Sequence, residues 1–144
     1  MVDKLIIELK SVYFVSLLGV LLYFGIIEFL IMDFFLYFEL NPEIDFILQC
    51  ILILLTFGTI YITLRFHKIK KVEQALISNP ETNFIRYSYL RYFFLDIAAI
   101  LNISYYMISA NSSCAWMATI LILAFPFVYP SKERFYNETH FAEK

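Results

Sequence analysis

The sequence predicts an all-α integral membrane protein with four transmembrane helices and both termini in the cytoplasm. Of its 144 residues, 61% are hydrophobic and 17% are charged, and the mean hydropathy is +0.72. Soluble domains contain roughly 45–50% apolar and about 25% charged residues, and a chain this short leaves much of its surface exposed after folding. The composition therefore excludes a typical soluble domain, and 16 Phe and 11 Tyr residues exclude a disordered chain.

The number of spans follows from the apolar stretches, because a helix needs about 20 mostly apolar residues to cross a bilayer. Stretches 11–32 and 46–64 qualify, and the only charge in them is Glu28. A third, uncharged stretch, 97–131, would form a helix of roughly 52 Å, too long for one span. Its polar centre at 111–114 favours a turn. We therefore predict a single domain over 1–144 with spans at about 12–36, 45–65, 90–110 and 115–130.

The basic residues predict the orientation of these spans. All 11 Lys and Arg residues lie before the first span, from the end of the second span to the start of the third, or after the fourth. The connection 33–45 carries four acidic residues instead. The positive-inside rule then places both termini, a hairpin at 66–89 and a tail at 131–144 in the cytoplasm. We expect the protein to lie in a bacterial inner membrane.

The cytoplasmic hairpin is predicted to be helical, because apolar residues recur at helical spacing across 68–78. The second helix is expected to continue to about Ile77. Asn79-Pro80 starts a third helix that reaches Ala110, since Asn caps helices and Pro suits the first helical position. Asn41-Pro42 predicts the start of the second helix in the same way. The region 66–92, basic and rich in tyrosine, is a candidate docking surface for a membrane or cytoplasmic protein partner or for anionic lipid. The alternative is that it only sets the topology.

Polar side chains within the spans are the candidate functional residues, because a charge at membrane depth is costly. Glu28 is the first candidate: a desolvated carboxyl group there can relay a proton or bind a cation. The alternative is a structural hydrogen bond to a neighbouring helix. Antiparallel pairing of the first two spans about Asn41 predicts Thr56 as its partner.

The third span carries two adjacent polar stripes, one with Asp96, Ala99, Ile103 and Tyr106, and one with Ala98, Asn102 and Tyr105. Small and polar residues at this spacing suit close packing against other helices. The alternative is that Asn102 and Tyr106 line a cavity together with Glu28. Near the cytoplasmic face, Asp96 is expected to form an ion pair with Arg65 or Arg91.

Sequence motifs for catalysis and cofactor binding are missing. Cys50 and Cys114 do not form a C-x-x-C pair, although a disulfide between them is one possibility. His67 and His140 are isolated, and the sequence contains neither a glycine-rich phosphate loop nor a serine-centred nucleophile motif. We expect no cofactor, no metal ion and no nucleic-acid partner.

These observations favour a small polytopic membrane protein without catalysis of its own, which acts through protein partners. It would be a subunit of a membrane complex or a protective, immunity-type protein. The first alternative is a small proton- or cation-coupled transporter or channel that uses Glu28, with Asn102 and Tyr106 near the path. The second alternative is a membrane-embedded enzyme that acts on lipids through Asp96 and the cluster of Arg65, Arg91 and Arg134.

Overall fold

The computed structural model of the chain describes residues 2–31, 41–109 and 112–139, and nearly all of them are helical. The helices are α1 (Val2–Ile26, continued by a π-helical turn, Ile27–Ile31), α2 (Pro42–Arg65), α3 (Lys70–Ser78), α4 (Pro80–Ser109), α5 (Ser112–Ala124) and α6 (Lys132–Thr139). Short 3-10 turns follow α2 at Phe66–Lys68 and α5 at Phe125–Val128.

The all-helical class is confirmed for the described residues, and three helical segments are long and apolar enough to cross a membrane. These segments are Val2–Leu30, Pro42–Lys68 and Pro80–Ser109. A fourth is present if Ser112–Val128 and Lys132–Thr139, which meet at 80°, are taken as one broken span. Part of the first predicted span, 12–36, lies outside the described residues.

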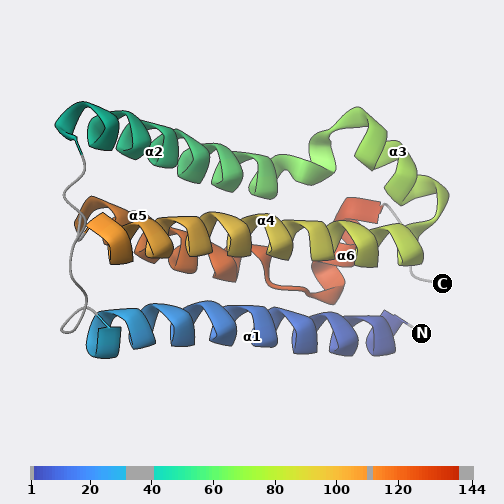
Figure 1. Cartoon of the computed structure of the whole chain (residues 1–144). Coiled ribbons are helices and arrows are strands. Elements are labelled where there is room, and N and C mark those ends of the chain that lie inside the picture. Colours follow the sequence, from blue (N-terminus) through green and yellow to red (C-terminus); the bar gives the residue numbers. More distant parts are fainter. Residues whose placement is uncertain (1, 32–40, 110–111, 140–144) are drawn as a thin grey trace.

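Helix α4 is the centre of the bundle, and α1, α2 and α5 run alongside it (Figure 1). Helices α1 and α2 lie on opposite sides of α4, although they are consecutive in the sequence. The start of α1, the whole of α3 and α6 are gathered at one end of the bundle, which we call the α3 end. The turn Ile27–Ile31 and the start of α2 are at the opposite end.

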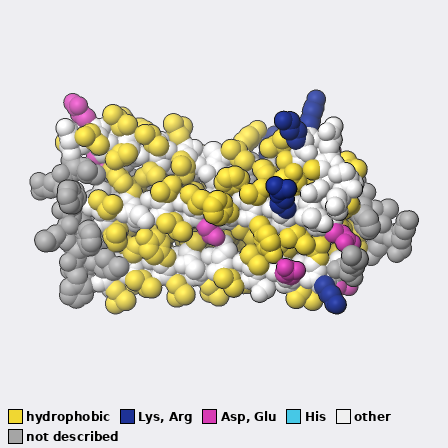
Figure 2. Space-filling model, turned by 45° about the vertical axis from the view of Figure 1, so that its right-hand side comes forward, with side chains coloured by type: hydrophobic (Ala, Val, Ile, Leu, Met, Phe, Trp, Pro, Cys, Tyr) yellow, Lys and Arg dark blue, Asp and Glu magenta, His cyan; other side chains and the backbone are white. Residues whose placement is uncertain are grey.

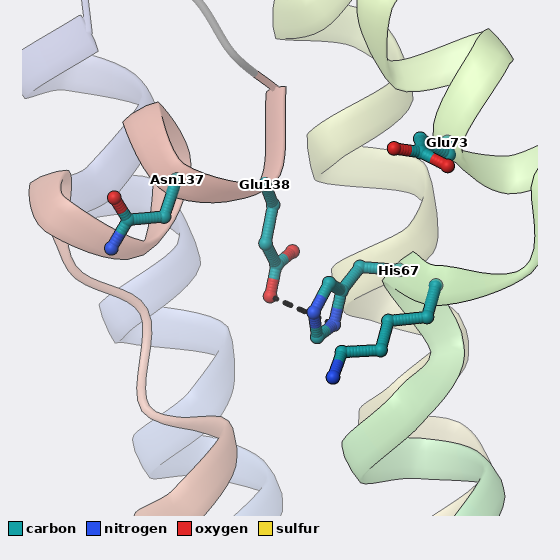
Figure 3. Close-up of a pocket in the computed structure, with 5 residues that line it drawn as sticks. His67, Glu73, Asn137 and Glu138 are labelled. Atoms are coloured by element: carbon teal, nitrogen blue, oxygen red, sulfur yellow. Dashed lines mark ion pairs between the residues drawn. The ribbon is translucent and has the colours of Figure 1, made fainter.

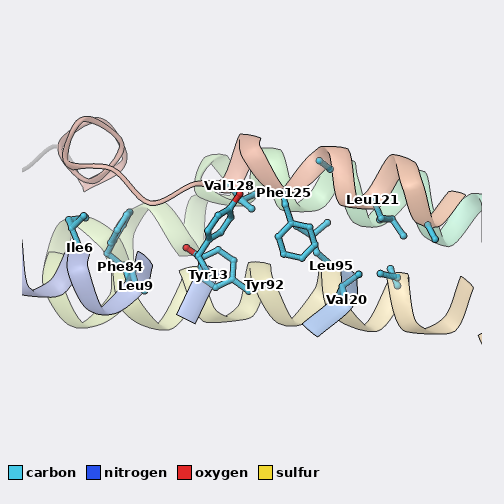
Figure 4. Close-up of a cluster of buried hydrophobic side chains, with 14 of the residues drawn as sticks. Ile6, Leu9, Tyr13, Val20, Phe84, Tyr92, Leu95, Leu121, Phe125 and Val128 are labelled. Carbon is cyan, nitrogen blue, oxygen red and sulfur yellow. The ribbon is translucent and has the colours of Figure 1, made fainter. Parts of the chain in front are cut away.

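Buried side chains on α1, α4 and α5 recur at intervals of three and four residues, which places them on one face of each helix. On α1 this face includes Leu9, Tyr13 and Val20, and on α4 it includes Phe84 and Leu95. Figure 4 shows these side chains packed against Leu121, Phe125 and Val128, which follow the same spacing along α5 and its 3-10 turn. The periodic apolar faces therefore bring three helices together in one core.

The two polar stripes of α4 face two different helices. Asp96 accepts a hydrogen bond from Ser16 Oγ of α1 at 2.5 Å. Asn102 Nδ2 donates to Thr56 Oγ1 of α2 at 2.9 Å. Each stripe therefore faces a different neighbour of α4. At the end of the bundle opposite the α3 end, the hydroxyl of Tyr105 donates to Asp45, which is a further side-chain hydrogen bond between α4 and α2.

The predicted helix starts agree with the structure, but the predicted extension of the second helix is wrong. Asn41 caps α2 by accepting the backbone N–H of Glu43 at 3.2 Å, and α4 begins at Pro80. Helix α2 ends at Arg65, because Ile69 adopts extended backbone (φ −69°, ψ 125°), and α3 is a separate helix. Both α2 and α3 contact α4.

Large apolar side chains cover much of the outer surface of the bundle (Figure 2). Leu54 is 74% exposed, Val15 is 69% exposed and Leu22 is 64% exposed. Lys and Arg side chains are gathered toward the α3 end in the same view. An apolar surface of this extent is unfavourable in water and suits contact with lipid.

Candidate functional site

Glu28 lies in the π-helical turn Ile27–Ile31 that continues α1. Single π turns inside α-helices are rare and are found frequently at functional sites. Ile27 is buried, whereas Glu28 is exposed, and the hydroxyl of Tyr106 on α4 donates to Glu28 Oε2 at 2.5 Å. The structure thus brings together two of the residues that the sequence singled out.

A groove of about 380 Å³ lies beside Glu28, between α1, α4 and α5, and we call it the Glu28 groove. It is lined by the carboxylate of Glu28, the rings of Phe24, Tyr106 and Trp116, and the hydroxyl-bearing residues Ser112 and Thr119. The rings of Phe24 and Tyr106 are 6.5 Å apart. An acidic group beside aromatic rings is the chemistry of a cation site.

The predicted pairing of Thr56 with Glu28, which was based on an antiparallel register of the first two spans, is not found in the structure. Thr56 Oγ1 accepts from Asn102 and donates to the carbonyl oxygen of Leu52 at 2.8 Å. The register failed because it assumed that α1 and α2 are neighbours, whereas α4 lies between them. Asn102 Nδ2 also donates to the carbonyl oxygen of Ala98 at 2.9 Å, and Asn102 and Thr56 are fully buried. This pair joins α2 to α4, and neither residue lines the Glu28 groove.

The predicted ion pair of Asp96 with Arg65 or Arg91 does not form among the described residues. Asp96 accepts a hydrogen bond from Ser16 instead. The guanidinium of Arg65 lies over the ring of Tyr61, 5.5 Å from its centroid. Arg91 and Asp96 are five positions apart on α4, so their side chains leave the helix in different directions. Of the four residues in the lipid-acting hypothesis, Asp96 and Arg65 therefore have partners outside that set.

Arg91 instead binds Glu138, a residue that the sequence did not identify. The guanidinium donates two hydrogen bonds to the carboxylate, from Nη1 at 3.1 Å and from Nη2 at 3.0 Å. Arg134 Nε donates to Glu138 Oε1 at 2.7 Å, one helical turn earlier on α6. His67 Nδ1 lies 3.7 Å from the same oxygen. We call these four residues the Glu138 cluster.

The Glu138 cluster fastens α6 to the α3 end of the bundle. Glu138 reaches from α6 toward His67, next to a cavity of about 270 Å³ that Glu73 and Asn137 also line (Figure 3). Arg91 and Glu138 are both almost fully buried, at 2% and 6% exposed. Bidentate arginine–carboxylate pairs are among the strongest hydrogen-bonded contacts in proteins. Two arginines face one carboxylate here, so the negative charge of Glu138 is fully compensated and the cluster carries a net positive charge.

The sequence analysis missed this cluster because it treated 131–144 as a tail. Helix α6 returns to the bundle, where Phe135 is fully buried and packs edge-on against Phe84 with ring centroids 5.1 Å apart. The spacing of Arg134 and Glu138, four residues apart on a helix, was the available signal. His67, predicted to be isolated, is brought to Glu138 by the corner that follows α2.

Comparisons of the chain with protein-family models, with curated proteins and with solved structures find no match. Among the described residues, no group of three or more His, Cys, Asp or Glu side chains is placed to hold a metal ion. Cys50 and Cys114 are both free thiols in the structure, and Cys114 is buried while Cys50 is exposed. The Glu28 groove and the α3 end are the two regions of the molecule whose geometry bears on function.

Proposed function

We propose that the chain is a small polytopic membrane protein, without catalysis of its own, that acts by binding a protein partner at its α3 end. The α3 end would lie in the cytoplasm and the apolar bundle in a bacterial inner membrane. The basic residues Lys68, Lys70, Lys71 and Arg86 support this orientation, since they are exposed near the α3 end, while Glu43 and Asp45 occupy the other end.

The observation that carries the proposal is that α3 is firmly placed yet presents an uncovered apolar edge. Val72 and Leu76 are buried against the bundle, and both α4 and α6 contact α3. On the outer side, Ile69 is 47% exposed and Ile77 is 53% exposed. A well-placed helix with exposed apolar residues next to lysines suits recognition of an acidic, amphipathic segment of a partner.

Site-specific photo-crosslinking in the native host tests this proposal. A photoreactive amino acid in place of Ile77 is expected to give a discrete protein adduct, because that side chain faces the partner. The same amino acid in place of Leu54, which is exposed on the apolar bundle, is the matched control and should label lipid. Equal labelling from both positions, or a chain that purifies in mild detergent with no adduct under any native expression condition, would contradict the proposal.

A second candidate function, proton- or cation-coupled transport, is favoured by the exposed carboxylate of Glu28 in its groove. Flux across liposomes should then depend on Glu28, so Glu28→Gln is expected to abolish it. Glu43→Gln removes an exposed acid outside the groove and is the control. Flux that survives Glu28→Gln, or no flux with protons or any monovalent cation, would exclude this function.

A further inference from the structure

We propose that the Glu28 groove is a binding site for a lipophilic organic ammonium ion. The site is distinct from the partner surface at the α3 end, and it rests on the same carboxylate as the transport candidate. Its ligand would enter from the bilayer and place its positive nitrogen between the carboxylate and the aromatic rings.

The segments that line the Glu28 groove contain no basic side chain to compensate the charge of Glu28. The sequence contains no Lys or Arg in 11–64 or in 92–131, which together supply every residue that lines the groove. Among the side chains that the structure describes, that of Tyr106 donates to Oε2 of Glu28, and none of them donates to Oε1. A carboxylate at membrane depth is costly to leave uncompensated, so the missing positive charge must come from a ligand or a proton.

The lining selects an organic cation over a metal ion. Metal ions need several oxygen, nitrogen or sulfur ligands around them, and the groove supplies one carboxylate with neutral hydroxyl groups. The groove is lined by Phe24, Tyr106 and Trp116, and aromatic rings attract an alkylammonium group by the cation–π interaction. A volume of about 380 Å³ is that of a small-molecule site rather than of an ion.

The groove is also accessible from the side of the bundle. Phe29, another lining residue, is 78% exposed, and Trp116 is 67% exposed. Gly25 lines the groove as well, and a Cβ atom added to it would have no heavy atom within 4 Å. This open space beside Glu28 is where the apolar part of the ligand would lie.

Trp116 is the only tryptophan in the chain, so its fluorescence reports directly on the groove. The protein is purified in an uncharged maltoside detergent and titrated with benzyltrimethylammonium. Neopentylbenzene, in which carbon replaces the charged nitrogen, serves as the neutral probe of the same shape. We expect a saturable change in Trp116 fluorescence with the ammonium ion. The affinity of the groove for the neutral probe should be lower than its affinity for the ammonium ion by about tenfold or more.

Two variants and their controls make the test specific. Glu28→Gln removes the charge and should weaken ammonium binding by about tenfold or more. Gly25→Leu fills the groove while keeping Glu28, and it should abolish binding of both probes. Two control variants should bind the ammonium ion as the unmodified protein does. They are Glu43→Gln, outside the groove, and Gly19→Leu, at a glycine of α1 with equally open surroundings. Melting temperatures in detergent verify that each variant is folded.

Equal affinity for the two probes, or unchanged binding by folded Glu28→Gln protein, would overturn the proposal. Displacement of the ammonium ion by millimolar Na⁺ or Mg²⁺ would also overturn it in favour of a metal-ion site. Binding is measured without a membrane, so it does not require transport. A groove that binds the ammonium ion in a protein with no flux refutes the transport candidate and leaves this site in place.

Discussion

Glu28 and Glu138 are two carboxylates near opposite ends of the bundle, and their surroundings differ in every respect that decides their role. Glu138 is 6% exposed and accepts hydrogen bonds from Arg91 and Arg134. Glu28 is exposed, accepts one hydrogen bond from Tyr106 and borders a groove. A carboxylate that the chain itself compensates serves the fold, whereas one that the chain leaves uncompensated is available for a ligand.

The largest effect on stability is expected at the Glu138 cluster. Arg91→Ala removes two hydrogen bonds and one compensating charge from a buried carboxylate. Arg134 still partners Glu138 in this variant, so we expect a loss at the lower end of the about 3–5 kcal/mol that breaking a buried ion pair from one side costs, and a clear fall in the melting temperature in detergent. Glu138→Leu is the companion variant: it leaves Arg91, which is 2% exposed, as a buried charge without a carboxylate, so it should be at least as damaging as Arg91→Ala. A Glu138→Leu variant as stable as the unmodified protein would show that these ion pairs do not hold α6 on the bundle.

A smaller effect is expected where α2 meets α4. Asn102→Leu keeps the volume of the side chain and removes the hydrogen bond to Thr56. Hydrogen bonds between helices within membranes contribute about 0.6–2 kcal/mol, so detergent or SDS titrations should show a loss of that order. Thr56→Val in the Asn102→Leu background should then add little, because the two residues share one contact. Fully additive losses would contradict the pairing.

Removal of the Glu28 charge should change stability least among the groups within the bundle. Glu28→Gln keeps a hydrogen-bond acceptor for Tyr106 and removes a charge that has no basic partner, so stability should stay the same or rise slightly. Thermal melting of Glu28→Gln and of Arg91→Ala in one detergent gives the comparison directly. A Glu28→Gln variant as unstable as Arg91→Ala would assign Glu28 to the fold and remove the contrast between the two carboxylates.

The smallest effect is expected at the ion pair between Lys132 and Asp3, which joins α6 to the start of α1. Both side chains are largely exposed, at 58% and 67%, and exposed pairs contribute little because water screens them. Lys132→Ala should therefore leave the melting temperature unchanged within error. A marked loss would show that the attachment of α6 depends on this contact as well as on the Glu138 cluster.

Local sequence patterns predicted the helical elements well, because each pattern acts within one helix. The asparagine–proline pair at 41–42 marks the start of α2, and Asn79-Pro80 marks the start of α4. The two polar stripes of α4 were visible from the 3.6-residue period alone. The break after Arg65 could not be predicted from the sequence, because residues 66–69 contain no glycine or proline to end the helix.

The partners of the polar residues were predicted less well. The sequence paired Glu28 with Thr56 and Asp96 with an arginine, whereas the structure pairs Glu28 with Tyr106 and Asp96 with Ser16. Both errors have the same physical cause. The helical period predicts which side chains share a face of a helix, but it does not predict which neighbouring helix packs on that face. Helix α4 lies between α1 and α2, and nothing in the local patterns states that order.

Composition and the distribution of charge determined that this chain is helical and apolar enough for a membrane, because these properties follow from transfer energies summed along the chain. Only the tertiary structure decided the roles of the two carboxylates. The return of α6 placed Glu138 between two arginines, and the order of the helices placed Glu28 in an aromatic groove without a basic residue. Compensation of charge depends on contacts between distant segments, and those contacts form only when the helices pack.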